Sequence, residues 1–446
     1  MTANIKKTII FMIFFMITSI VASFQWCFAE DFIDITKFSL RKIPIAIPLI
    51  NVLPQGQDAL SLKSSEMLSN DLDFTGYFKI LDRKDFKIAE NSKTENQQLD
   101  SAAINFKDWT GIGAELLITG NAIFKDDLIE IEFRLFDTFK SQLLIGKRYK
   151  GWQKDLHRII RRFCSEVIHH LTGQWGIYES KIAFISTGTG NKEIYICDFD
   201  GKNPGPLTRN KSINLSPGWS SDGKWMAYTS FKRGRPDLYI KNIHGKMGAV
   251  VAKKGINTTP AWVPGKSMLA ATLSFSGDQD IYLLTQKGKI VKQLTNKWGI
   301  DTSPTWSPDG KQMAFVSSRS GTPQIYIKSL DTGKIKRITF EGRYNTQPDW
   351  SPRGDKIVYS AIERGEINIH IVDLKSLNSA RLTYGTRKNE SPTWSPDGSL
   401  IAFSSTRERG VARIFVMTSY GTDQRRLFSM PGEQTSPKWS PRIKNN

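Results

Sequence analysis

From about residue 177 onward, short runs of alternating apolar and polar residues recur at a fixed interval. A Pro-x-Trp element marks each repeat, with tryptophans at 219, 262, 306, 350, 394 and 439, which are 43, 44, 44, 44 and 45 residues apart. After each of the first five comes a tight turn, such as Ser-Pro-Asp-Gly at 307–310, and then three short strands rich in β-branched and aromatic residues. Four strands in each such repeat match one propeller blade.

The two ends of this repeat region complement each other. Residues 181–208 supply three strands with no Pro-x-Trp strand before them, whereas Pro437-Lys438-Trp439 supplies that strand with only seven residues after it. The sequence therefore predicts an all-β propeller of six blades over 177–446, closed by the C-terminal strand pairing with the first three-strand set. Closure removes the exposed sheet edges that would otherwise aggregate.

Residues 30–172 have a different pattern, which predicts a small α/β domain. We expect strands over 42–50, 76–81, 115–120, 128–136 and 143–149, a helix over 64–72, and a polar loop over 90–100. The clearest helix covers 153–171, with its apolar residues on one face and Gly173 just beyond its end. The predicted fold is thus an α/β N-terminal domain followed by a six-bladed propeller.

The first 29 residues predict a secretory signal peptide. Lys6 and Lys7 precede the uncharged apolar stretch Thr8–Ala22, and Cys27-Phe28-Ala29 places small residues at the −3 and −1 positions of a cleavage site. An uncleaved anchor is the alternative, and a lipoprotein site is disfavoured because Gln25 and Trp26 precede Cys27. The mature chain is expected to be soluble in the periplasm and not membrane-spanning, which argues against nucleic acid as a partner.

The positive charge belongs almost wholly to the repeats. The chain has 62 Lys and Arg against 43 Asp and Glu, a net charge of +19, of which residues 176–446 carry +18 and residues 30–175 carry −1. The basic residues are spread through predicted loops on both sides of the ring, with no single stripe of the kind that tracks nucleic acid. We interpret the charge as general attraction to an acidic partner or to the anionic envelope.

The sequence offers little for catalysis or metal binding. It contains no Gly-x-Ser-x-Gly, His-Glu-x-x-His, P-loop or Gly-x-Gly-x-x-Gly motif. Of the five histidines, His169 and His170 adjoin at a helix end, and His370 stands in a strand where sister blades carry Tyr or Phe, which favours a structural role. We predict no catalytic residue, cofactor or metal; a periplasmic propeller hydrolase or glycan-binding protein is the alternative.

Two cysteines remain in the mature chain, one in each predicted domain. Cys164 and Cys197 have no spacing that indicates a metal or redox pair. An oxidising compartment allows a disulfide between them, but two buried free thiols are the favoured interpretation.

A polar residue stands three positions before each repeated proline. In a closed six-bladed ring these residues would surround one mouth of the central channel, and we call them the mouth ring: Asn214, Asn257, Asp301, Asn345, Asn389 and Gln434. One interpretation is that each side chain caps the turn entering the inner strand. The other is that the ring contacts a partner, with Thr258, Thr302, Thr346 and Thr435 extending the same loops.

Taken together, these features resemble one known family. The signal peptide, the α/β domain with Gly76-Tyr77-Phe78 and with Gly-Ala-Glu-Leu-Leu-Ile-Thr-Gly at 113–120, and the repeats built on Pro-x-Trp-Ser-Pro-Asp-Gly are similar to the TolB family, the periplasmic propeller proteins of the Tol-Pal system. The resemblance spans about residues 30–441. Two repeats depart from this pattern: Val263-Pro264-Gly265 lacks the Asp of the turn, and Trp350 is followed by Ser-Pro-Arg-Gly-Asp at 351–355.

The resemblance implies a monomeric, non-enzymatic adaptor. Members of the family bind the peptidoglycan-associated lipoprotein Pal at the propeller's channel mouth, which would involve the mouth ring together with Thr258, Thr259 and Thr302. The start of the mature chain binds the inner-membrane protein TolA, which would place Phe32, Ile33 and Ile35 in a TolA-binding strand within Glu30–Leu40. Binding at one site is expected to alter the availability of the other.

Overall fold

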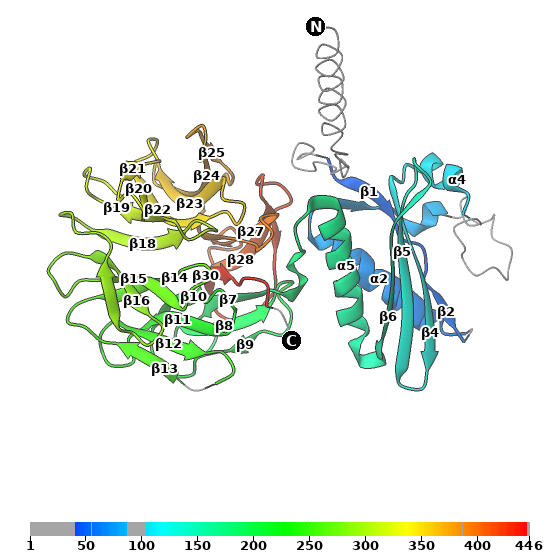
Figure 1. Cartoon of the computed structure of the whole chain (residues 1–446), viewed down its shortest axis with the longest axis horizontal. Helices are drawn as coiled ribbons and strands as arrows, with labels where there is room; N and C mark the ends of the chain where they lie inside the picture. Colours follow the sequence, from blue (N-terminus) through cyan, green and yellow to red (C-terminus); the bar gives the residue numbers. More distant parts are fainter. Residues whose placement is uncertain (1–40, 55, 87–103, 246, 386, 444–446) are drawn as a thin grey trace, which may run out of the picture.

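The computed structural model describes residues 41–54, 56–86, 104–245, 247–385 and 387–443. They form an N-terminal α/β domain beside a six-bladed propeller (Figure 1), so the predicted fold class is confirmed. The predicted signal peptide, the predicted TolA-binding strand and the predicted loop over 90–100 lie outside the described residues. Across the described ranges, no helix has the length and apolar character needed to span a membrane.

One mixed sheet forms the framework of the N-terminal domain. Its strand order is β3-β1-β4-β5-β6, with β2 also paired to β4. The strands are β1 (Ile43–Ala46), β2 (Asn51–Leu53), β3 (Phe78–Ile80), β4 (Leu116–Lys125), β5 (Leu128–Asp137) and β6 (Gln142–Trp152). The strand predicted over 42–50 is shorter in the structure: it ends at Ala46, two residues before Pro48, which has no N–H to continue a ladder, and β2 begins just beyond the predicted end.

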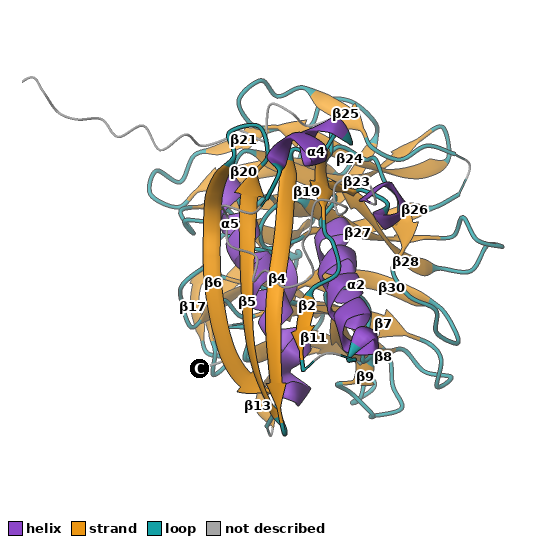
Figure 2. Ribbon diagram, turned by 90° about the vertical axis from the view of Figure 1, so that its right-hand side faces the viewer, coloured by secondary structure: helices purple, strands orange, loops and turns teal. Residues whose placement is uncertain are grey.

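Two long helices, α2 (Asp58–Phe74) and α5 (Leu156–Thr172), cover the face of this sheet that looks toward the propeller (Figures 1 and 2). The prediction of α5 is confirmed, and the amide of Gly173, at φ 71°, caps it by donating to His169 O over 2.8 Å. Helix α2 begins six residues before its predicted start, and within it Ser65 Oγ accepts from Ile50 N over 2.9 Å. A short helix, α4 (Phe106–Gly111), was not predicted.

Each blade is an antiparallel sheet of four strands. The innermost strands are β10 (Asn214–Trp219), β14 (Asn257–Trp262), β18 (Asp301–Trp306), β22 (Tyr344–Trp350), β26 (Asn389–Trp394) and β30 (Gln434–Trp439). The second strands are β7 (Lys181–Ser186), β11 (Trp225–Ser230), β15 (Met268–Leu273), β19 (Gln312–Ser317), β23 (Lys356–Glu363) and β27 (Leu400–Ser405). The third strands are β8 (Glu193–Asp198), β12 (Asp237–Asn242), β16 (Asp280–Thr285), β20 (Gln324–Ser329), β24 (Glu366–Asp373) and β28 (Arg413–Thr418). The outer strands are β9 (Gly205–Pro206), β13 (Met247–Val251), β17 (Ile290–Gln293), β21 (Ile335–Arg337), β25 (Ser379–Arg381) and β29 (Arg425–Arg426).

The ring closes as predicted, through the C-terminal strand. The first blade has the order β30-β7-β8-β9, with Gln434 opposite Ser186 and Trp439 opposite Ile182. Tryptophan side chains join neighbouring blades: Trp262 Nε1, for example, donates to Gly218 O over 3.1 Å. At the closure, Trp219 Nε1 donates to Lys438 O over 3.0 Å, which extends the same contact across the two ends of the propeller chain.

The core of the N-terminal domain continues into the propeller. Phe163 on α5 belongs to the same buried cluster as Phe199 of the first blade and Leu400 of the sixth. Cys164 and Cys197 also lie in this cluster as free buried thiols, which confirms the favoured interpretation of the cysteines. Burial raises the pKa of both thiols and keeps them protonated.

Candidate functional site

The six mouth-ring residues occupy one equivalent position, close to the start of each innermost strand. In each blade the ring residue is opposite the same position of the second strand, as in Asn214 opposite Ser230 and Asp301 opposite Ser317. All six side chains are buried, with at most 1% of their surface exposed. The ring residues thus form part of the wall around the propeller axis.

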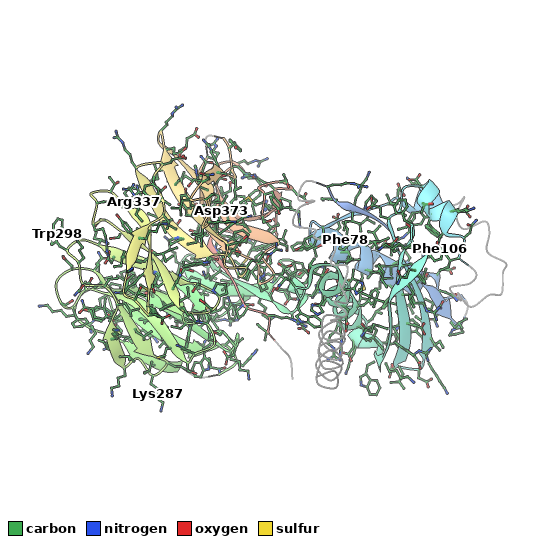
Figure 3. The ribbon with its side chains drawn as sticks, turned by 45° about the horizontal axis from the view of Figure 1, so that its top comes forward. Phe78, Phe106, Lys287, Trp298, Arg337 and Asp373 are labelled. Atoms are coloured by element: carbon green, nitrogen blue, oxygen red, sulfur yellow. The ribbon has the colours of Figure 1, made fainter. Side chains whose placement is uncertain are left out.

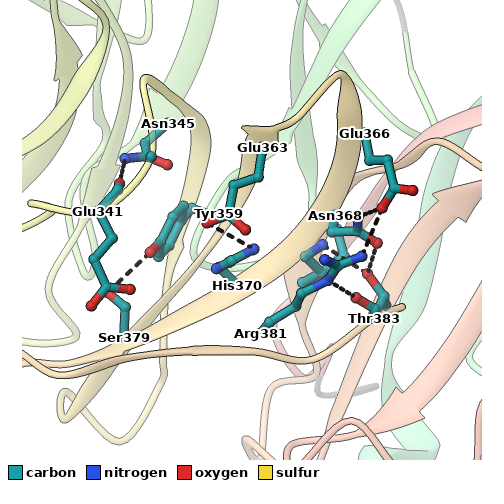
Figure 4. A network of polar contacts seen from close by, with 12 residues as sticks. Glu341, Asn345, Tyr359, Glu363, Glu366, Asn368, His370, Ser379, Arg381 and Thr383 are labelled. Carbon is teal, nitrogen blue, oxygen red and sulfur yellow. Dashed lines mark hydrogen bonds and ion pairs between the residues drawn. The ribbon is translucent and has the colours of Figure 1, made fainter. Parts of the chain in front are cut away.

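Hydrogen bonds explain this burial. Asn257 Nδ2 donates to Pro236 O over 3.1 Å and to Lys253 O over 2.8 Å, and its Oδ1 accepts from Lys253 N over 3.1 Å. Asn345 likewise donates to Glu341 O over 2.8 Å (Figure 4). The interpretation that the ring residues hold the turns entering the inner strands is confirmed for the five amides. The carboxylate of Asp301 pairs with Arg319 instead. The part of the ring residues in contacting a partner stays a prediction.

Asp301 is the one carboxylate of the ring, and an arginine neutralises it. Arg319 Nη2 lies 2.8 Å from Asp301 Oδ2, and only 11% of the arginine side chain is exposed. The guanidinium lies 5.2 Å from the ring centre of Phe315 and 5.1 Å from that of Tyr326. Because both charges are buried, removing one partner would leave the other uncompensated.

A β-bulge follows the ring residue in every inner strand. The residue two positions after it adopts a positive φ between 45° and 56°, and the six are Ser216, Thr259, Ser303, Gln347, Ser391 and Ser436. Non-glycine residues seldom adopt this conformation, and its repetition in all six blades makes it part of the blade architecture. Of these six residues, the sequence analysis names only Thr259. The other five could have been found because a polar residue directly precedes every repeated proline.

The structure brings two of the three predicted threonines, Thr259 and Thr302, into contact across neighbouring blades, whereas Thr258 contacts the preceding blade. Thr259 Oγ1 lies 2.8 Å from Thr272 Oγ1 and 3.4 Å from Thr302 Oγ1, and it accepts from Ser303 N over 3.3 Å. Thr258, which accepts from Thr229 Oγ1 over 3.0 Å, is half-buried like Thr259 and Thr302. These hydroxyls, unlike the ring amides, remain partly accessible to a bound partner.

A second polar feature lies deeper along the axis, at the middle residue of Pro-x-Trp. Lys438 Nζ is 2.5 Å from Asp349 Oδ1, so the pair reaches from β30 past β26 to β22. Asp349 Oδ2 also accepts from Thr393 Oγ1 over 3.0 Å and from Trp394 N over 2.8 Å. Sequence reasoning missed this pair, although the other blades carry Gly, Ala or Thr at that position.

The remaining candidates lie elsewhere. Phe32, Ile33 and Ile35 lie outside the described residues. His169 stacks on Trp175 with ring centres 4.1 Å apart, and His370 is buried against Tyr359 (Figure 4). Among the residues that the structure describes, no three His, Cys, Asp or Glu side chains are grouped so as to hold a metal ion.

Known proteins match both parts of the chain. A family model described as the TolB amino-terminal domain matches residues 32–144, and one described as the TolB beta propeller domain matches residues 168–443. The chain is 59% identical over 415 residues to the Tol-Pal system protein TolB of Desulfosudis oleivorans, covering 93% of this chain and 94% of the relative. A TolB homolog of Chlorobium chlorochromatii is 41% identical over 50% of this chain and 49% of its own. The crystal structure of TolB from Acinetobacter baumannii matches with a TM-score of 0.74 at 25% identity, covering 90% of this chain and 97% of that one.

Proposed function

The chain belongs to the TolB family, and from this premise we propose that it is a non-enzymatic adaptor of the Tol-Pal system that works in the periplasm. In this role it would join the lipoprotein Pal, at the outer membrane and peptidoglycan, to TolA of the inner membrane, and so support outer-membrane integrity and envelope constriction at division. The observation that carries the proposal is the 59% identity to a Tol-Pal system protein, which extends over 93% of this chain. The match of both domain families to the two parts of the chain supports it further.

Pal would bind at the mouth of the propeller. The half-buried side chains of Thr258, Thr259 and Thr302 and the exposed Gln347 would make the direct contacts. The mouth-ring residues would support binding without touching Pal, because their hydrogen bonds hold the loops that present those side chains. This division of roles accounts for side chains that are polar, repeated and yet buried.

TolA would bind the start of the mature chain, with Phe32, Ile33 and Ile35 as the apolar side chains of an added strand. Contacts between the domains give a route by which one site could sense the other. Arg161 on α5 lies 2.7 Å from Asp200 of the first blade, and Arg425 of the sixth blade donates to Phe74 O at the end of α2 over 2.5 Å. These contacts lie at the end of the propeller opposite the mouth, so a change on Pal binding would have to pass along the blades to reach the N-terminal domain.

Calorimetric titration with purified Pal and purified TolA tests the proposal. We expect the mature chain to bind both proteins, and a chain lacking residues 30–40 to lose TolA while keeping Pal. Failure of the folded mature chain to bind either protein would contradict the adaptor role. Retention of TolA by the shortened chain would overturn the assignment of the N-terminal segment alone.

A further inference from the structure

The end of the propeller farthest from the N-terminal domain, which we call the distal end, has an unusual surface. It consists of the loops that join each second strand to its third strand and each outer strand to the next inner strand. The N-terminal domain contacts the opposite end, where Tyr77 meets Arg353 in the turn after β22. Figure 3 shows Trp298 projecting from the distal end, away from that domain.

Three large aromatic side chains stand on three successive distal loops. Trp298, between β17 and β18, is 83% exposed; Phe340, between β21 and β22, is 60% exposed; and Tyr384, between β25 and β26, is 73% exposed. Ile300 and Tyr344 add further exposed apolar surface on the same loops. We call this set the aromatic arc. Apolar groups this exposed and this close in the fold indicate an interaction surface.

Cationic groups are fixed directly beside these rings. Arg337 Cζ lies 5.3 Å from the ring centre of Phe340, and its Nε donates to Thr339 O over 2.6 Å. Arg381 repeats the arrangement, 5.0 Å from the ring of Tyr384 and with its Nε donating to Thr383 O over 2.6 Å. Each ring is thus presented together with a guanidinium whose position is held by the backbone.

The other half of the distal end is strongly basic. Exposed basic side chains fill the loops between β9 and β10, β11 and β12, and β13 and β14, and we call them the basic arc: Arg209, Lys211, Lys232, Arg233, Arg235, Lys253 and Lys254. By blade equivalence, Arg209 and Lys253 take the place that Phe340 and Tyr384 occupy in the fourth and fifth blades. The exposed acidic side chains of the described distal loops are Asp278, Glu341 and Glu433.

We propose that the distal end docks on the surface of an anionic phospholipid bilayer. Aromatic rings favour the boundary between lipid headgroups and acyl chains, and basic side chains are attracted to lipid phosphates. The rings stand on separate loop tips around a rim, and Phe340 and Tyr384 each have an arginine beside them, which suits a fluid anionic surface better than one protein groove. The two arcs stand on the loops that surround the mouth ring, since Asn257 holds Lys253 of the basic arc and Asn345 holds Glu341 beside Phe340. A bilayer and Pal would therefore compete for this end of the propeller, and vesicle binding is measured without Pal.

Vesicle sedimentation of the mature chain tests this proposal. We expect the chain to sediment with vesicles of phosphatidylglycerol and phosphatidylethanolamine, to stay in solution with pure phosphatidylcholine, and to be released by added salt. The variant W298S/F340S/Y384S should lower the partition coefficient about ten-fold, and K211Q/K253Q/K254Q should lower it by a similar factor.

Two matched variants distinguish a specific surface from general charge. K287Q/K289Q/K292Q neutralises three exposed lysines of the third blade outside the distal loops, two before β17 and one within it, and W152S removes an exposed tryptophan of the N-terminal domain. Both should sediment like the unchanged chain. The proposal would be overturned if the mature chain did not sediment with anionic vesicles. It would also be overturned if the matched variants lost vesicle binding as much as the aromatic and basic variants do, or if the aromatic variant sedimented like the unchanged chain. Loss of Pal binding by the aromatic variant, with vesicle binding intact, would assign the surface to a protein instead.

Discussion

A single residue in the second blade leaves a buried carboxylate without its usual partner. In three other blades a threonine after the outer strand donates to the first polar residue of the third strand: Thr208 to Glu193, Thr295 to Asp280 and Thr339 to Gln324. In the fifth blade Thr383 bonds in the same way with Asn368, near the start of β24. The second blade has Ala252 at this position. Both carboxylate oxygens of the buried Asp237 consequently lack a hydrogen bond, and its nearest cation is Arg235, with Nε 3.3 Å away.

We therefore predict that Ala252→Thr stabilises the protein. The new hydroxyl would donate to Asp237, as its counterparts do, and the gain in the free energy of unfolding should be about 1 kcal/mol. Urea denaturation measures it. Ala252→Val is the matched control, because it adds the same volume without the hydroxyl. An equal gain from valine would show that the hydrogen bond is not the cause.

His370 places a titratable ring inside the fifth blade. Its sister positions carry Tyr195, Tyr239, Tyr282, Tyr326 and Phe415. The ring is buried against Tyr359, its Nε2 has no hydrogen bond, and Glu363 Oε1 lies 3.8 Å away (Figure 4). Burial lowers the pKa of His370 below its usual 6.5, an effect that the charge of Glu363 only partly opposes.

This lowered pKa predicts acid sensitivity. As the pH falls below about 6.5, the unfolded chain takes up a proton that the folded chain resists, so the free energy of unfolding decreases until the folded pKa is passed. His370→Phe should remove this part of the pH dependence and stabilise the protein at pH 5 relative to pH 8. Thermal melts at both pH values measure the effect. His244→Ala, at an exposed position, should leave the dependence unchanged, and a pH profile unaltered by His370→Phe would contradict the assignment.

Among the elements, the C-terminal strand has the largest structural role. Strand β30 supplies the inner strand of the first blade, and Trp439, which is 4% exposed, donates from Nε1 to Ser180 Oγ over 2.8 Å. Without this strand β7 would become an exposed edge, and the contact of Trp219 with Lys438 would be lost.

Deleting residues 435–446 should destabilise the whole ring. Loss of a buried tryptophan alone costs about 3–5 kcal/mol, and loss of the strand adds to it, so we expect unfolding well below the temperature of the full chain. Circular dichroism melts measure this. Deleting only residues 444–446, which leaves β30 intact, is the control. If the chain lacking residues 435–446 melted at the same temperature as the full chain, closure of the ring by β30 would be refuted.

The sequence predicted the secondary-structure elements and their order better than it predicted the side-chain contacts. The 44-residue period and the incomplete end repeats were sufficient for the blades and their closure, because strand order follows directly from the repeat. They could not reveal the burial of Asn257 or Asn345, since that depends on which loop carbonyls face each amide. The pair of Asp349 and Lys438 joins residues 89 apart and exists only once the ring has closed.

At the scale of the whole molecule, the two domains are joined by buried charges. Arg161 lies between two carboxylates, 2.7 Å from Asp200 of the propeller and 3.5 Å from Asp71 of α2, and both carboxylates are largely buried. His157 Nε2 lies 3.3 Å from the same Asp71. The arginine also packs over Phe199, 4.7 Å from the ring centre. A propeller moving relative to α2 would have to separate these groups.

Arg161→Met should therefore loosen the contact between the domains. It leaves two buried carboxylates without their shared cation, and we expect a loss of about 3 kcal/mol together with separation of one calorimetric transition into two. Arg158→Met, at a side chain that is 72% exposed, is the matched control. A single transition at an unchanged temperature would show that the charges do not hold the domains together.

The calorimetric affinity for purified Pal tests the central claim most directly. A bulky cation at the mouth should block binding, so Thr258→Arg and Thr302→Arg should each weaken the affinity by at least about 30-fold while the variants remain folded. Thr332→Arg, at an exposed position at the opposite end of the fourth blade, should bind Pal as the unchanged chain does. Full-affinity binding by both folded mouth variants would contradict the account.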